Sequence, residues 1–120
     1  MKKQVNLEQT RALNAFNACE GTVMAGVDGG EVVKKLPPII RENGMLGALA
    51  YALSKDGKSY GYPKAFQAIC KHLHDIKKVN AETVEDLQKE LMECPALKLR
   101  DVTSEAMLFL NYMRRFAQKE

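Results

Sequence analysis

The chain has 120 residues, of which 46% are apolar and 28% are charged, and it contains no tryptophan. This length and balance fit one globular domain that buries enough apolar surface to fold without a metal or a disulfide. The net charge of +3 permits contact with phosphate groups, but it is smaller than the charge of a dedicated nucleic-acid-binding domain.

The first predicted helix begins after Asn6, a suitable N-cap residue, and ends near Met24. Helical spacing places Leu13, Phe16 and Cys19 mostly on one face, which we expect to point inward. The glycines of residues 25–31 (AGVDGGE) predict a surface loop. This loop lacks the Gly-Lys-Ser/Thr ending of a phosphate-binding loop.

The second predicted helix, residues 31–43, contains the unusual pair Pro37 and Pro38. Proline has no backbone N–H and disfavours helical backbone in the preceding residue, so we expect a bend near Leu36 or a new helical start. Asn43-Gly44 predicts a left-handed stop. A short helix that is apolar all round, and therefore largely buried, follows over residues 45–55.

The second half of the chain gives three more helices after a predicted loop at 56–63. They span residues 63–78, then from Asn80 or Thr83 to Pro95, then about 100–118. Their predicted inward residues are Phe66, Ile69, Leu73, Ile76, Val84, Leu87, Leu91, Val102, Ala106, Phe109, Met113 and Phe116. No segment alternates as a strand does, so the predicted fold is all-α, a single compact bundle of about six helices over residues 1–120.

Cysteine usage and the start of the chain bear on location. Cys19, Cys70 and Cys94 are widely spaced and form no Cys-X-X-Cys pair, which argues for reduced thiols in a cytoplasmic protein. The stretch MKKQVNLEQTRAL lacks an apolar signal segment. No apolar run approaches the ~20 residues that span a bilayer, so we expect no membrane partner.

A catalytic or metal site is not evident in the sequence. His72 and His74 are two residues apart and lie on different faces of a helix, and Cys70 with His74 gives too few ligands for zinc. No residue is identified that could orient a Cys-His nucleophile pair. We expect no catalytic residue, metal, cofactor or small-molecule substrate. Tyr60 and Tyr62 can stack on bases, but half-buried loop anchors are the commoner role of such tyrosines.

Basic residues are the candidate nucleic-acid ligands. Lys34, Lys35 and Arg41 flank the prolines, and Lys55 and Lys58 follow. A bend in the chain would gather them into one phosphate-binding patch, whereas the alternative is scattered solubilising charge.

Two pairs in the last helix are further candidates. Arg114 and Arg115 lie away from its apolar stripe, where guanidinium groups can bind phosphate; the alternative is a solvated helix end. Met107 and Leu108 are apolar yet point away from that stripe, so either this helix is central or this surface contacts a partner.

Four segments carry a family resemblance. Leu36-Pro37, Ile40 and Asn43-Gly44 resemble the L-P-x-x-I-x-x-N-G segment of the small helical subunit of type III-B (Cmr) CRISPR effector complexes. Residues 46–61 are similar to the apolar helix and glycine-bearing loop of that family, and residues 100–118 to its closing helix. The stretch LEQTRALNAF is similar to its first helix. Pro38, Met45 and Tyr112 depart from the family pattern.

The resemblance implies a non-catalytic subunit that stacks with copies of itself as a minor filament in an antiviral ribonucleoprotein. It implies contact with guide RNA and target RNA along their groove, and with the backbone and large subunits. The alternative from the residues alone is a helical DNA-binding transcription regulator with residues 64–78 as its recognition helix. A small enzyme is the third and weakest hypothesis.

Overall fold

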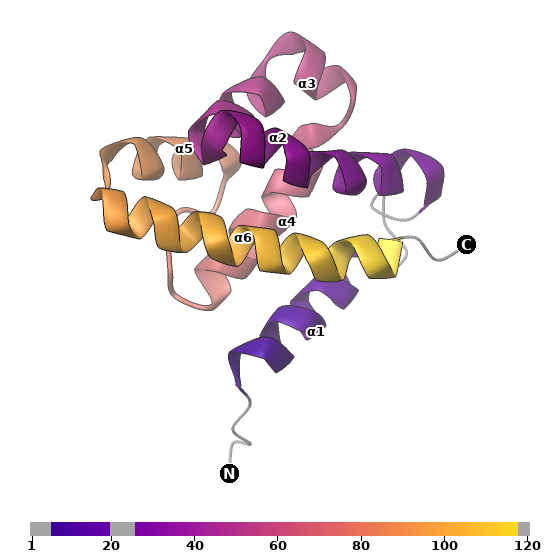
Figure 1. Cartoon of the computed structure of the whole chain (residues 1–120), viewed down its shortest axis with the longest axis horizontal. Coiled ribbons are helices and arrows are strands. Elements are labelled where there is room, and N and C mark those ends of the chain that lie inside the picture. Colours follow the sequence, from indigo (N-terminus) through magenta and orange to yellow (C-terminus); the bar gives the residue numbers. More distant parts are fainter. Residues whose placement is uncertain (1–5, 20–25, 118–120) are drawn as a thin grey trace.

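The computed structural model describes residues 6–19 and 26–117 of the chain. In these ranges the backbone forms six helices and no strand (Figure 1): α1 (Leu7–Cys19), α2 (Gly26–Leu53), α3 (Lys55–Ser59), α4 (Tyr62–Asp75), α5 (Val84–Glu93) and α6 (Ala96–Ala117). The predicted all-α compact fold is confirmed. The Cα radius of gyration is 13.6 Å, which equals the about 13.6 Å expected for a compact chain of this length.

Helix α6 is the central helix of the fold. It packs against α1, α2 and α4, and Figure 1 shows it running along the molecule with α2 on one side and α1 on the other. Val102, Ala106, Phe109 and Met113 are buried, as the four- and three-residue spacing predicts, and Leu110 is buried as well. The helix is therefore covered on more than one side, which explains why its apolar residues exceed a single stripe.

Helix α2 continues through Pro37 and Pro38, so the predicted alternative of a new helical start is wrong, and the non-helical backbone inside α2 lies at Gly44. Each proline removes the amide that would bond the carbonyl four residues earlier. The same turns bury Val33, Leu36 and Ile40 against the rest of the core. Burial of these apolar side chains therefore outweighs the poor helix propensity of the prolines.

Gly44 is the point at which α2 changes direction. Its φ of 80° and ψ of 164° lie in a region that is essentially restricted to glycine. The predicted break at Gly44 is confirmed, but the predicted left-handed helical conformation is wrong because ψ is extended. Beyond Gly44 the predicted apolar helix forms the second segment of α2, with Met45, Ala48, Leu49 and Ala52 buried.

Two predicted loops are partly helical, so both predictions are corrected. The backbone is helical from Gly26, within the predicted loop 25–31, and α3 occupies much of the predicted loop 56–63. Ser54 caps α3 by accepting a hydrogen bond from the Gly57 amide at 3.2 Å. Gly57 lies so close to the backbone of Tyr51 and Ala52 that a Cβ atom would collide with it. This close approach, which a sequence pattern does not reveal, folds α3 onto the end of α2.

Helix α1 begins as predicted but shows a different face to the core. The Gln9 amide donates to Asn6 Oδ1 at 2.8 Å, and the Asn6 amide donates to Gln9 Oε1 at 2.9 Å, which is a capping box. Leu13 and Phe16 are 58% and 47% exposed, so their predicted inward position is wrong. Cys19 is buried as predicted, and the small residue Ala15 faces the core as well. The predicted end near Met24 lies outside the described residues.

Helices α4 and α5 match their predicted faces. Phe66, Ile69 and Leu73 of α4 are buried and Ile76 is half-buried, while Val84, Leu87 and Leu91 of α5 are buried. Thr83 caps α5 by accepting from the Asp86 amide at 3.1 Å. The Glu90 carboxylate ties the connection between these helices to α6, because it accepts from the Asn80 and Ala81 amides and from Lys98.

We predict that Pro38→Ala stabilises the protein. The side chain is exposed, and alanine would restore the missing amide donor inside α2 and remove the clash of the ring with the preceding turn. We expect the free energy of unfolding to rise by about 2 kcal/mol in urea titrations. Pro63→Ala is the matched control, since Pro63 stands in the first turn of α4, where no intrahelical donor is needed. A loss of stability in Pro38→Ala would contradict the prediction.

Gly44→Ala should destabilise the protein by about 1–3 kcal/mol. Open space surrounds the position of a Cβ atom at Gly44, so the strain would come from the positive φ alone. Thermal unfolding followed by circular dichroism would measure the effect. The neighbouring exposed residue gives the control Asn43→Ala, for which we expect a change within about 0.5 kcal/mol. Equal stability of the two variants would show that Gly44 carries no conformational constraint.

Candidate functional site

The seven predicted basic residues are all exposed, and they lie on three helices. The first segment of α2 carries Lys34, Lys35 and Arg41, α3 carries Lys55 and Lys58, and the last turn of α6 carries Arg114 and Arg115. Lys34 and Arg41 are seven residues apart and so share a face of α2. The chain turns between the α2 and α3 cations at Gly44, seven and six residues after the two prolines.

The basic residues of α3 and α6 lie on different sides of α2, which carries the third group. Helix α2 packs against α6, with the start of α2 and the end of α6 at the same side of the molecule (Figure 1). Helix α3 packs against α2 and α4 and lies beyond α2 as seen from α6 (Figure 1). Helix α2 therefore lies between the basic residues of α3 and those of α6. The seven basic residues do not form one continuous patch across the three helices.

A hollow between α1 and α6 contains one of the predicted arginines. Glu8, Arg11, Leu108, Asn111, Tyr112 and Arg115 line it. The Tyr112 hydroxyl donates to Glu8 Oε2 at 2.7 Å and joins the two helices at the surface. Leu108 is 44% exposed here, whereas Met107 packs against the buried core. Of the two predicted partner contacts, Leu108 is thus the one that presents a large exposed surface.

A buried polar cluster joins α1, α4 and α6 at the centre of the molecule. Arg11 donates to Glu105 twice, from Nε at 2.8 Å and from Nη2 at 2.7 Å. His72 Nε2 lies 2.8 Å from Glu105 Oε2, and the His72 ring stacks on Phe109 with centroids 4.4 Å apart. His72 is 1% exposed and Glu105 4%. Two planar charge-assisted hydrogen bonds to the carboxylate are the geometry by which arginine stabilises a buried anion.

The partners of Asn14 fix the proton of His72. The Asn14 Nδ2 atom lies 3.0 Å from Asp75 Oδ2 and 2.9 Å from His72 Nδ1. A carboxylate only accepts, so this Asn14 atom is the donating amide nitrogen, and His72 Nδ1 accepts its second hydrogen. His72 is then neutral and carries its proton on Nε2, from which it donates to Glu105.

The electrostatics of the cluster agree with this assignment. Burial lowers the pKa of His72 below its ordinary value of 6.5, and the hydrogen bond to Glu105 offsets this only in part. Burial alone would raise the pKa of Glu105, but the hydrogen bonds from Arg11 and His72 outweigh it and hold that pKa below 4.5. At neutral pH the cluster is an ion pair with a neutral imidazole.

The cysteines and histidines show no reactive pairing in the described part of the chain. Cys70 is buried, burial raises its pKa to about 11, and its Sγ–H donates to the Ala81 carbonyl at 3.4 Å. Burial also raises the pKa of Cys19 to about 11, and this thiol donates to the Met113 carbonyl at 3.5 Å. Among residues 6–19 and 26–117, no three His, Cys, Asp or Glu side chains are grouped to hold a metal ion. The His74 side chain is 45% exposed, so the prediction that His72 and His74 lie on different faces is confirmed.

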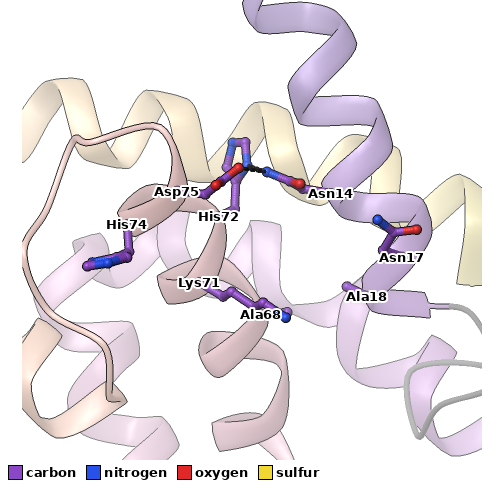
Figure 2. A pocket seen from close by; sticks show the side chains of 8 residues that line it. All are labelled: Asn14, Asn17, Ala18, Ala68, Lys71, His72, His74 and Asp75. Carbon is purple, nitrogen blue, oxygen red and sulfur yellow. Dashed lines mark hydrogen bonds between the residues drawn. The ribbon is translucent and has the colours of Figure 1, made fainter. Parts of the chain in front are cut away.

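A second hollow lies between α1 and α4, beside the buried cluster. It has a volume of about 310 Å³ and is lined by Asn14, Asn17, Ala18, Ala68, Lys71, His72, His74 and Asp75. Figure 2 shows the Asn14 amide directed at His72 and Asp75, with Lys71 and Ala68 across the hollow. The sequence did not predict this hollow or the cluster, because Asn14 and His72 are 58 residues apart and Arg11 and Glu105 are 94 apart.

Residues 7–120 match the family model described as CRISPR-associated protein (Cas_Cmr5). The match covers nearly the whole chain, so this chain belongs to that family, the small helical subunit of type III-B Cmr complexes. No curated protein and no solved structure was found to match the chain. The resemblance inferred from residues 36–44, 46–61 and 100–118 is confirmed.

Family membership places the chain with the Cmr complex. In the part of the chain that the structure describes, no helix is both long enough and apolar enough to cross a membrane.

The buried cluster predicts a pH-dependent stability. Because the pKa of His72 is lowered on folding, the unfolded chain binds more protons below about pH 6.5, and stability should fall as the pH drops from 6.5 toward 5. We expect a slope of up to about 1.4 kcal/mol per pH unit, measured as the free energy of unfolding in urea. The pKa of Glu105 is lowered from 4.5, so this carboxylate affects stability at more acidic pH. Between pH 6.5 and 5 the expected slope therefore comes from His72.

The control for this prediction is the neighbouring histidine. His72→Gln should remove the slope between pH 6.5 and 5, while His74→Gln, at an exposed position of the same helix, should keep it. A slope that survives in His72→Gln would show that another group is responsible.

Proposed function

We propose that the chain is a non-catalytic subunit of a type III-B Cmr ribonucleoprotein, in the cytoplasm, that contacts guide RNA and target RNA. It would assemble along the groove of the guide–target duplex, stack with further copies in a minor filament and touch the backbone and large subunits. Its role would be antiviral defence by assembly and electrostatic guidance. The family match over residues 7–120 is the observation that carries this proposal.

The exposed cations support direct RNA contact. Among the described residues, no ion pair engages Arg41, Arg114 or Arg115, so their guanidinium groups are available for phosphate. Guanidinium binds phosphate through two parallel hydrogen bonds, which gives position as well as attraction. The exposed Lys34, Lys55 and Lys58 add positive charge on α2 and α3.

Leu108 supports contact with a protein partner. It is exposed on α6, about two turns from Arg115, and lines the same hollow. Met107, next to it, packs against the core and holds this part of α6 in place. An exposed leucine beside a polar hollow is suited to the edge of a subunit contact.

A non-catalytic role agrees with the chemistry of the buried groups. Cys70 stays protonated because its pKa is about 11. The ring nitrogens of His72 are both engaged, by Asn14 and Glu105. Family membership favours this function over the alternative of a DNA-binding regulator with residues 64–78 as its recognition helix.

The proposal predicts salt-sensitive RNA binding without cleavage. The full chain should bind single-stranded RNA weakly, and Arg114→Ala/Arg115→Ala should reduce the slope of log affinity against log salt by about 0.7 for each phosphate that the variant no longer neutralises. Fluorescence anisotropy between about 50 and 200 mM salt would measure it. Lys71→Ala/Lys89→Ala removes two exposed charges from α4 and α5 and is the matched control.

Three results would contradict the proposal. An equal decrease of the slope in the control variant would show non-specific attraction. Hydrolysis of RNA by the pure chain would show catalysis. Failure of the chain to co-purify with guide RNA and the other Cmr subunits, when they are produced together, would remove the assembly role.

A further inference from the structure

Three aromatic rings meet at the surface where α1 passes the end of α6. Phe16 and Phe116 pack edge to face, with ring centroids 5.4 Å apart and an interplanar angle of 88°. Tyr112 and Phe116 lie closer to parallel, 6.4 Å apart at 27°. Phe16 keeps 47% of its surface exposed and Phe116 is half-buried. An aromatic cluster that is open to solvent next to a buried core is a typical feature of a binding surface.

Positive charge borders the same cluster. Tyr112 and Arg115 line the hollow between α1 and α6, together with the polar side chains of Arg11 and Asn111. Tyr112 and Phe116 are four residues apart and share a face of α6, and Arg115 is next to that face. Glu8 is the carboxylate among the described lining residues, and the Tyr112 hydroxyl already donates to it. The hollow and the rings therefore form one continuous surface that combines aromatic faces with guanidinium donors.

We propose that Phe16, Tyr112 and Phe116 form an aromatic platform that stacks unpaired bases of single-stranded RNA while Arg115 holds an adjacent phosphate. The inference rests on the proposed RNA contact and adds to it a site for RNA bases that are not paired within the guide–target duplex. Every base offers a π face, so stacking does not depend on sequence. In a duplex the bases are already stacked on one another, so the platform favours a single strand over a duplex.

The charges at the edge of the platform favour RNA over an apolar protein surface as the occupant. Arg114 and Arg115 are exposed and have no ion-pair partner among the described residues. A closely packed apolar partner would remove water from these guanidinium groups without pairing them, which is unfavourable. Phosphate would pair them directly.

Binding of the full chain to RNA that carries the fluorescent base 2-aminopurine tests this inference. Single-stranded RNA and a duplex of the same length are compared. When 2-aminopurine in the single strand stacks on an aromatic ring of the protein, its fluorescence is quenched. Phe16→Leu keeps an apolar side chain but removes the ring, and it should weaken single-strand binding about tenfold, abolish the quenching and leave the salt slope unchanged. Arg115→Ala should lower the salt slope by about 0.7 and keep the quenching.

Controls separate stacking from folding. Leu13→Ala removes another exposed apolar side chain of α1 and should bind as the wild type does. Thermal unfolding of each variant shows whether the helices are intact. If Phe16→Leu lowers the unfolding temperature, Phe116→Leu tests the second ring of the same pair by the same quenching assay.

The outcomes distinguish this inference from the proposed function. RNA binding that is unaffected by both ring variants, or as strong for the duplex as for the single strand, overturns the platform and leaves the RNA-contacting role standing. Failure of Phe16→Leu to co-purify with Cmr subunits, with RNA binding intact, assigns the rings to a protein interface and also overturns it. If the wild-type chain binds neither single-stranded nor duplex RNA, both the aromatic platform and the proposed RNA-contacting role are overturned.

Discussion

The arrangement of the helices depends on one carboxylate. Glu105 is buried on α6, where it accepts two hydrogen bonds from Arg11 of α1 and one from His72 of α4. A buried anion is stable only while its partners remain, and removal of one partner of such a pair costs about 3–5 kcal/mol. The positions of α1 and α4 relative to α6 are therefore coupled. Both surface hollows follow from this constraint, because Arg11 lines the one between α1 and α6, and Asn14 and His72 line the one between α1 and α4.

The sequence signature that reveals the family describes the fold rather than the ligand. Leu36 and Ile40 are buried on the first segment of α2, and Gly44 supplies the positive φ at which the helix turns into its second segment. Leu36 and Ile40 have apolar side chains and Gly44 has none, so these three residues offer RNA neither a charge nor a side-chain hydrogen bond. The signature thus preserves the path of α2 through the core, while the exposed Lys34 and Arg41 between and beside its positions are the residues that can contact phosphate.

Periodicity predicted what depends on local spacing. The inward faces of α4, α5 and α6 and the caps at Asn6 and Thr83 follow from neighbours within one or two turns, and they are confirmed. The face of α1 was predicted wrongly because small residues, Ala15 among them, pack on the core and leave Phe16 outside. Helix α3 was missed because Gly57 fits against the α2 backbone, a contact between two elements. Exposure of Arg114 and Arg115 could be predicted from helical rotation and is confirmed. The placement of the basic residues relative to one another could not, because it depends on how α2, α3 and α6 pack together. The Arg11–Glu105 pair, 94 residues apart, has no local signal.

The burial of two thiols has a practical consequence. Cys19 and Cys70 each bond a backbone carbonyl in the interior, and protonation at neutral pH deprives them of the thiolate that electrophiles and peroxides attack. A reagent can therefore modify these two thiols only after the surrounding helices separate. The rate at which a maleimide or iodoacetamide reagent modifies Cys19 and Cys70 therefore reports transient opening of the interior, and these two thiols should resist oxidation while the subunit is folded.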